Sequence, residues 1–589
     1  MNLKSKLLEA QVIAMSVKDN LMNQNLVEGE KKLQELKLKV ADCKKTYDQL
    51  QLLNKISYTK AFYQDGLIVF EAGNTAIDGG LTAIQAVIPH TKILGLEGEG
   101  SFEGGSAENR IQLMIETLDE ITPELKQAID QLDQAVNKIS QIETNKYPEY
   151  FKGQEVRSRI VSAKKTGTEG IVFIKQFIPV LEELPGILGG RGEEKKYFIL
   201  FQNDNELRPT GGFLTAYAVV IIKDGKVVPE KSGDIYDLDE KFRAKETFPP
   251  SMAKYIKNIY KWNLRDMNIN PDFEVSMSKF YENYITIPNH TTDIDGIISV
   301  DTNVLSGLLE VIGPVDVPGY GIFSAEIEEE CDCPQVVYAL SEIITKPTNY
   351  IREDRKGVLG PLMQTILQKT YSSPKDYMQD LLELAWTSLS QKNIQVYMFD
   401  EKGQAAMETL NGAGKLETPT NGEDFLAIIN TNLAGGKSNL FVNYEVRQTA
   451  ELPSNGQLKK KVEITYRNSG KPSNCDLEAG ELCLNVTLTD WTRLYVPEGS
   501  QIVSSQGFLE DAIQYDEDGF TIIEGYFTLE PEGMAKVIVE YTIPYADTEN
   551  YKVKIWKQGG VDPFKTLLDV TGGQEEVMVD KDILYSTAF

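Results

Sequence analysis

The chain has 589 residues, of which 60 are basic and 88 are acidic, so its formal net charge is −28. This acidity disfavours a nucleic-acid partner, because phosphate backbones are bound by clustered lysines and arginines. The length exceeds that of a single hydrophobic core and predicts roughly three or four domains. Only two histidines are present, His90 and His290, which argues against histidine-based metal sites or catalytic triads.

The first 190 residues show helical periodicity. Apolar residues recur at spacings of three and four over 33–50 and again over 118–139, as in long amphipathic helices. The glycine-rich stretch 95–105 between them contains acidic residues and is not followed by the Lys-Ser or Lys-Thr pair of a phosphate loop, so we interpret it as a helix-to-helix loop. We therefore predict a helical bundle or coiled hairpin over 1–190.

From residue 196 the pattern changes to alternating strands and helices. The apolar runs 197–201 and 214–222 have the length of buried strands. We then expect a short strand at 233–238 and a helix at 250–261. A strand at 293–301, a helix at 304–312 and a strand at 315–317 follow with short joints, which predicts a βαβ layer. These elements predict an α/β domain over 195–415.

A period of two appears after residue 439. Seven short runs between 441 and 543, separated by turn residues, predict an immunoglobulin-like β-sandwich over 436–550. Residues 551–589 form a C-terminal extension that either adds strands or packs along the sandwich. The predicted fold class is therefore multidomain α+β.

The five cysteines fall into three groups. Cys43 lies on an apolar helical stripe and is expected in a core. Cys475 and Cys483 flank a turn-rich loop and are expected to be bonded, or close enough to bond, in an oxidising compartment. Cys331 and Cys333 form a Cys-x-Cys pair without a second pair or nearby histidines, which is a poor pattern for zinc.

The segment 202–213, which we call the signature loop, connects the first two predicted strands of the α/β domain. It reads Gln202-Asn203-Asp204-Asn205-Glu206-Leu207-Arg208-Pro209-Thr210-Gly211-Gly212-Phe213. This resembles the signature of the DUF4012 proteins, which typically carry an N-terminal membrane anchor. The resemblance implies a cell-surface or envelope location on the outer face of the plasma membrane, with an anchor preceding Met1. The chain itself has no run of the ~18 apolar residues that a membrane span needs, and a complete cytosolic protein is the alternative.

Residues 196–412 are also distantly similar to the LytR-CpsA-Psr family of envelope glycopolymer transferases. Three features occur in that family's order: Arg208-Pro209-Thr210, the strand-helix-strand segment 295–317, and Arg352-Glu353-Asp354-Arg355. The resemblance implies an α/β/α sandwich that binds a polyprenyl-pyrophosphate-linked glycan. It also implies attachment of that glycan to a cell-wall polymer.

Several arginines at one end of a sheet would bind a diphosphate, because the guanidinium fork matches phosphate oxygens. We assign catalytic roles to Arg208, Arg352 and Arg355. Ligand-binding roles are expected for four further residues, namely Thr210, Gly211, Gly212 and Arg265. The structural alternative is that Arg208 bonds Asp237 and Asp239 and locks the edge of the sheet.

The transferase family's metal-binding aspartate after the first arginine is replaced here by Pro209. Asp204, Asp237 or Asp239 would have to hold Mg²⁺ in its place, with Asp237 and Asp239 as our assignment. Without Mg²⁺, phosphoryl transfer loses its main electrostatic partner. Two function classes therefore stay open, namely a glycopolymer-attaching envelope enzyme and a non-catalytic surface scaffold or adhesion protein.

Overall fold

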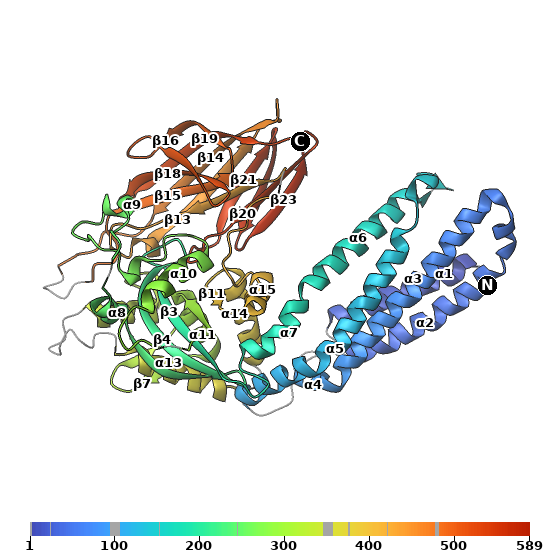
Figure 1. Cartoon of the computed structure of the whole chain (residues 1–589), viewed down its shortest axis with the longest axis horizontal. Helices are drawn as coiled ribbons and strands as arrows, with labels where there is room; N and C mark the ends of the chain where they lie inside the picture. Colours follow the sequence, from blue (N-terminus) through green and yellow to red (C-terminus); the bar gives the residue numbers. More distant parts are fainter. Residues whose placement is uncertain are drawn as a thin grey trace. The chain divides into compact units, whose positions relative to one another are not determined.

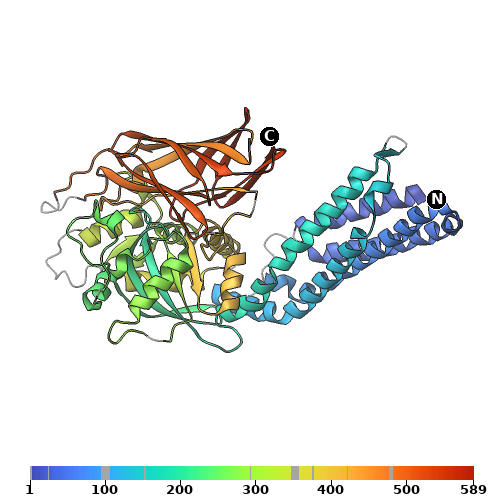
Figure 2. The same ribbon diagram turned by 45° about the horizontal axis from the view of Figure 1, so that its top comes forward.

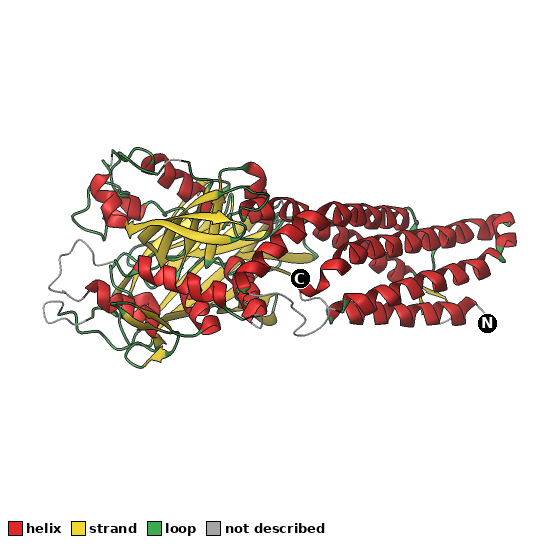
Figure 3. Cartoon of the chain, turned by 90° about the horizontal axis from the view of Figure 1, so that it is seen from below, coloured by secondary structure: helices red, strands yellow, loops and turns green. Residues whose placement is uncertain are grey.

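The computed structural model of the chain describes residues 3–23, 25–94, 106–151, 154–243, 245–291, 293–345, 357–374, 377–420, 422–476 and 482–589. The chain divides into two compact units. The helical unit consists of Met1–Glu194, Lys223–Lys226 and Pro374–Asp376, and the mixed unit consists of Lys195–Ile222, Val227–Ser373 and Tyr377–Phe589. Strands are concentrated in the mixed unit (Figure 3). The architecture is multidomain α+β, with an N-terminal helical region, a central mixed sheet with helices, and C-terminal all-β sheets.

The helical unit is built from long helices that lie side by side (Figures 1 and 2). The α-helices of this unit are α1 (Leu3–Met22), α2 (Leu26–Asp48), α3 (Ser57–Val87), the single turn α4 (Thr91–Leu94), α5 (Ala107–Ser140), α6 (Arg157–Gln176) and α7 (Ile178–Ile187), with a small hairpin of β1 (Tyr150–Phe151) and β2 (Gln154–Glu155). Helix α3 packs against α2 and α5, and both α6 and α7 pack against α5. The periodic stripes predicted from the sequence supply this packing, since Leu33 and Cys43 of α2 and Ile121 and Ile129 of α5 are buried. The expectation that Cys43 lies in a core is confirmed.

The central sheet of the mixed unit has five strands in the order β11-β6-β3-β4-β5. They are β3 (Lys195–Asn203), β4 (Phe213–Lys223), β5 (Lys226–Asp234), β6 (Gly296–Val300) and β11 (Ile394–Met398). The sheet is mixed, because β3 runs antiparallel to β4 and parallel to β6, and β11 runs antiparallel to β6. Tyr197 and Phe198 point to opposite faces of β3 and are both fully buried, as the unbroken apolar run predicts.

Eight α-helices accompany the central sheet in the described part of the mixed unit: α8 (Ile235–Lys241), α9 (Pro250–Ala253), α10 (Phe273–Tyr284), α11 (Thr302–Ile312), α12 (Gln335–Thr345), α13 (Leu359–Ser372), α14 (Met378–Ser390) and α15 (Glu401–Thr409). The prediction of a separate strand at 233–238 is wrong. β5 ends at Asp234, whose carboxylate accepts a hydrogen bond from the backbone N–H of Tyr236 and caps α8. The helix expected at 250–261 is reduced to the single turn α9.

The predicted βαβ layer is also wrong. After α11, β7 (Val315–Val317) pairs with β8 (Gly321–Phe323) as a two-stranded hairpin and does not enter the central sheet. Gly319 and Gly321 have positive φ angles of 85° and 94°, which turn the chain back directly after three strand residues. Two further short strands, β9 (Ile327–Glu328) and β10 (Cys333–Pro334), pair with each other.

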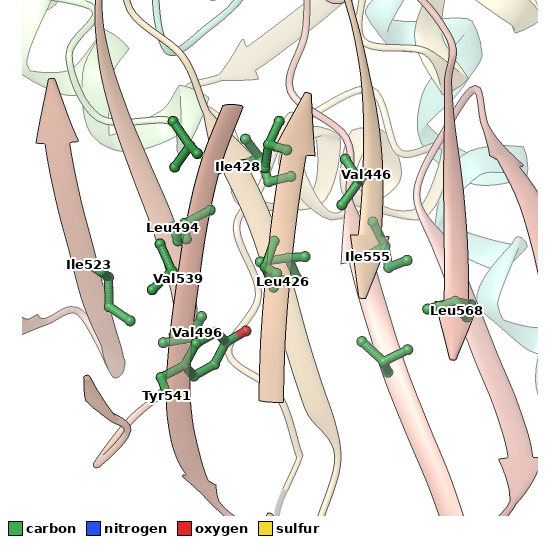
Figure 4. Close-up of a cluster of buried hydrophobic side chains, with 14 of the residues drawn as sticks. Leu426, Ile428, Val446, Leu494, Val496, Ile523, Val539, Tyr541, Ile555 and Leu568 are labelled. Atoms are coloured by element: carbon green, nitrogen blue, oxygen red, sulfur yellow. The ribbon is translucent and has the colours of Figure 1, made fainter. Parts of the chain in front are cut away.

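The C-terminal part forms two six-stranded sheets, ordered β17-β18-β15-β12-β20-β23 and β16-β19-β14-β13-β21-β22. Their strands are β12 (Asp424–Ile429), β13 (Val442–Ala450), β14 (Gln457–Asn468), β15 (Leu488–Pro497), β16 (Gln501–Gln506), β17 (Ile513–Glu517), β18 (Phe520–Leu529), β19 (Met534–Pro544), β20 (Asn550–Trp556), β21 (Phe564–Val570), β22 (Gly573–Val579) and β23 (Ile583–Ala588). The last four strands extend both sheets, and β20 and β21 pair in parallel with β12 and β13. Figure 4 shows the shared core, to which β12 contributes Leu426 and Ile428 and β19 contributes Val539 and Tyr541.

Two disulfides are present, Cys475–Cys483 and Cys331–Cys333. The first confirms the pairing expected from the sequence. Within the described ranges, no helix combines the length and apolar character needed to cross a membrane.

Candidate functional site

The signature loop is held by buried amide side chains. Gln202 is 3% exposed, and its Oε1 accepts hydrogen bonds from Thr210 Oγ1 and from the N–H of Gly212, both at 2.9 Å. Asn268, fully buried, donates from Nδ2 to Thr210 Oγ1 at 2.8 Å and to the Gly212 carbonyl at 2.9 Å. These bonds occupy the Thr210 hydroxyl and the backbone of Gly212, which the sequence had assigned to a ligand.

The glycine pair in the loop serves close backbone packing. A Cβ atom on Gly212 would overlap the backbone of Asn203, and Gly211 has a φ angle of 133°, which side chains rarely adopt. The loop therefore turns back on the end of β3, and its glycine backbone faces protein atoms.

Arg208 is buried, with 4% of its surface exposed. Its Nη1 donates to the carbonyl oxygens of Leu207, at 3.2 Å, and of Asn432, which lies beyond the end of β12. The guanidinium also lies 5.3 Å from the ring centroid of Phe213. Arg208 is therefore engaged with the C-terminal part of the mixed unit.

Arg265 is occupied by carboxylates. Its Nη1 lies 2.6 Å from Asp239 Oδ2, its Nε lies 3.6 Å from Asp266 Oδ2, and its guanidinium covers the ring of Tyr236 at 4.7 Å. The structural alternative for Arg208 is thus wrong in its partner, because Arg265 takes Asp239. Burial raises the pKa of Asp266, while the positive charges of Arg208 and Arg265 oppose that rise.

Both proposed metal ligands, Asp237 and Asp239, lie on α8. Asp239 accepts hydrogen bonds from Arg265 and from the N–H of Leu264, and burial raises its pKa to about 6 although Arg265 opposes the shift. Asp237 is half-buried on α8. No cluster of three or more histidine, cysteine or acidic side chains suited to a metal occurs in the described part of the chain. Arg352 and Arg355 lie outside the described residues.

Two segments of the C-terminal part, 430–432 and 557–560, are hydrogen-bonded to the signature loop. Gln558, just after β20, donates from Nε2 to the carbonyls of Arg208 and Asn430, both at 2.9 Å. Its Oε1 accepts from the N–H of Asn430 at 2.8 Å. We call the signature loop together with 430–432 and 557–560 the seam. Sequence reasoning missed the second and third of these segments, because their polar residues have no local motif.

A polar cavity of about 230 Å³ lies beside the seam. Its lining includes Asp204, Thr302, Asn430, Asp490 and Asp562. Asp204 accepts hydrogen bonds from the N–H and the hydroxyl of Thr302, at 3.0 and 2.6 Å. Burial raises the pKa of Asp204, and it raises that of Asp490 to about 7. The lining contains no lysine or arginine among the described residues, so this cavity offers a diphosphate no cationic side chain.

The region that contains the signature loop is similar to a known protein family. Residues 192–329 match the family model described as "Protein of unknown function (DUF4012)". The match covers the signature loop and strands β3, β4, β5 and β6. No curated protein matches the chain.

Proposed function

We propose that this chain is a non-catalytic cell-surface or envelope protein that acts as a scaffold or adhesion module. The observation that carries this proposal is the burial of Arg208 in the seam, where Asn432 and Phe213 surround its guanidinium. An arginine that recognises phosphate must present its fork of donors to the ligand. The partner that fits the proposal is a cell-wall polymer rather than a lipid-linked pyrophosphate.

The proposed location rests on two lines of support. The disulfides Cys331–Cys333 and Cys475–Cys483 are typical of an oxidising compartment, and the DUF4012 resemblance implies the outer face of the plasma membrane. We further propose that the N-terminal helices form a bundle or coiled hairpin that serves as a stalk. The two C-terminal sheets would then act as an immunoglobulin-like sandwich that supports the central module.

The competing proposal is a glycopolymer transferase with an α/β/α sandwich similar to that of the LytR-CpsA-Psr family. It requires Arg208 to leave Asn432 and Mg²⁺ to displace Arg265 from Asp239. Calorimetric titration of a short-chain polyprenyl diphosphate, with and without Mg²⁺, separates the two. The matched variants are Arg208→Ala and Arg243→Ala, since Arg243 is an exposed arginine of the same unit.

The scaffold proposal expects no Mg²⁺-dependent heat from the wild type or from either variant. Equal binding by all three proteins would place the ligand away from the seam and leave Arg208 structural. Binding by the wild type and Arg243→Ala but not by Arg208→Ala, with all three folded by circular dichroism, would overturn the proposal in favour of the transferase.

A further inference from the structure

A lysine and an aspartate face each other inside the two C-terminal sheets. Asp424 is the first residue of β12 in one sheet, and Lys460 belongs to β14 in the other. Both side chains are fully buried, and Lys460 Nζ contacts Asp424 Oδ2. Apolar residues of the shared core lie two positions away on the same strands, Leu426 on β12 and Leu458 and Val462 on β14. The contact therefore bridges the sheets in a region from which water is excluded.

The ammonium group of Lys460 is poorly satisfied. A protonated lysine has three N–H donors, and in the part of the chain that the structure describes Asp424 is the one acceptor bonded to Lys460. An ammonium in such surroundings carries a desolvation penalty. Burial accordingly lowers the pKa of Lys460 and favours the neutral amine, which is a nucleophile.

A second buried lysine shows the contrast. Lys392 is 1% exposed and contacts Asp582, but its Nζ also donates to the carbonyl of Lys557 at 2.8 Å and lies 3.7 Å from the ring centroid of Trp556. Its three partners match its three donors. Lys392 and Asp582 thus form a complete ion pair and provide an internal control for Lys460 and Asp424.

Both carboxyl oxygens of Asp424 accept hydrogen bonds from other residues. Its Oδ1 accepts from the backbone N–H of Phe425 at 2.7 Å, and its Oδ2 accepts from the hydroxyl of Tyr551. Tyr541 lies directly opposite Lys460 in the β14–β19 ladder, so the two side chains share one face of the sheet. The Tyr541 hydroxyl is buried without a hydrogen-bond partner among the described residues.

We propose that Asp424 and Lys460 condense to an intramolecular amide that links the two sheets covalently. A proton first moves from the Lys460 ammonium to Oδ2, and the Nζ lone pair then attacks Cγ. Negative charge develops on Oδ1, where the N–H of Phe425 stabilises it. The Cγ–Oδ2 bond breaks with its electron pair, and Oδ2 leaves as water with a second proton from Nζ.

The step is balanced without an oxidant or a cofactor, because an ammonium and a carboxylate give one amide and one water. The product has one N–H in place of three, and the Tyr541 hydroxyl is the acceptor that we assign to it. Burial of a charged pair is thereby replaced by burial of one neutral amide.

Mass spectrometry of the intact, reduced and denatured chain tests the proposal. The expected mass is that of the sequence minus one water, and proteolysis should release a branched peptide that joins Asp424 to Lys460. Lys460→Met, which removes the nucleophile, should restore the sequence mass. Lys392→Met should keep the loss of water.

Each other outcome counts against the amide. A wild-type mass equal to that of the sequence overturns it directly, whether or not Lys460→Met folds. A loss of water mapped to any other residues, including Lys392 with Asp582, overturns the assignment to this pair. Asp424→Asn adds an independent readout, because condensation of an asparagine with Lys460 would release ammonia in place of water.

Discussion

Gly560 lies against the carbonyl group of Gly211, so close that a Cβ atom on Gly560 would overlap the Gly211 oxygen. This contact joins the signature loop to the segment after β20. Gly560→Ala should therefore destabilise the mixed unit by more than the roughly 1–3 kcal/mol that a non-glycine residue costs at positive φ. The measurement is the free energy of unfolding in denaturant.

Gly572→Ala is the matched control for this variant. Gly572 also has positive φ, 92° against 70° for Gly560, but an added Cβ would have no heavy atom within 4 Å. The difference between the two variants isolates the overlap with Gly211. Equal destabilisation by the two variants would mean that the backbone at Gly211 and Gly560 moves to accommodate the added methyl group at little cost.

Removal of the Arg208 side chain should lower stability. Arg208→Ala leaves the Asn432 carbonyl without its charged donor and withdraws a positive charge from the buried Asp266. The expected loss is roughly 3 kcal/mol, the upper range for a hydrogen bond to a charged group. Arg243→Ala, at an exposed position, should change stability by about 0.5 kcal/mol or less. If both substitutions have the same small effect, Arg208 does not stabilise the seam.

Asp490 should make stability depend on pH. Burial raises its folded-state pKa to about 7, whereas an unfolded aspartate titrates near about 3.9. The folded state therefore binds more protons between these values, and its stability falls as the pH rises from about 4 to about 7. The stability of Asp490→Asn should not fall in this way. Its free energy of unfolding, relative to that of the wild type, should therefore rise by up to roughly 4 kcal/mol between about pH 4 and about pH 7.

Unfolding in denaturant between pH 4 and pH 8 measures this difference. The control is Asp511→Asn, at an exposed aspartate of the same unit, which should follow the wild-type profile. A difference between wild type and Asp490→Asn that does not change with pH would show that Asp490 is ionised in the folded state.

The pairing of the cysteines predicts a thiol count. Of the five cysteines, Cys43 is free and the other four form two disulfides. Protein produced in an oxidising compartment and unfolded without reductant should show one thiol per chain, and Cys43→Ala should show none. Three or more thiols in the wild type would contradict the pairing.

Much of the fold is predictable from local pattern. The apolar run 197–201 falls in β3, the amphipathic segment 304–312 falls in α11, and the period of two after residue 439 marks the C-terminal sheets. The predicted element boundaries that were wrong lie at expected turns. Two of the seven short runs predicted between 441 and 543 span 520–523 and 526–529. In the structure they form the single strand β18, because Gly525 continues the ladder opposite Thr492.

The partners of the candidate site are beyond local pattern. The signature loop is visible in the sequence, but Arg208 bonds Asn432 across 224 residues and Gln558 bonds the Arg208 carbonyl across 350. The residues next to Asn432 and Gln558 in the sequence form no motif that would predict their contacts with Arg208. The arginine therefore suggested an anion site, whereas the folded chain surrounds it with its own carbonyl groups.

Native-state hydrogen exchange of the full chain tests most directly whether the seam makes the central sheet and the C-terminal sheets one cooperative body. In the wild type, amides of β4 (Phe213–Lys223) and β15 (Leu488–Pro497) should open together, with the same free energy and the same denaturant dependence. In Gly560→Ala the amides of β4 and those of β15 should open with different free energies. Independent opening of β4 in the wild type, at lower free energy than β15, would contradict the account.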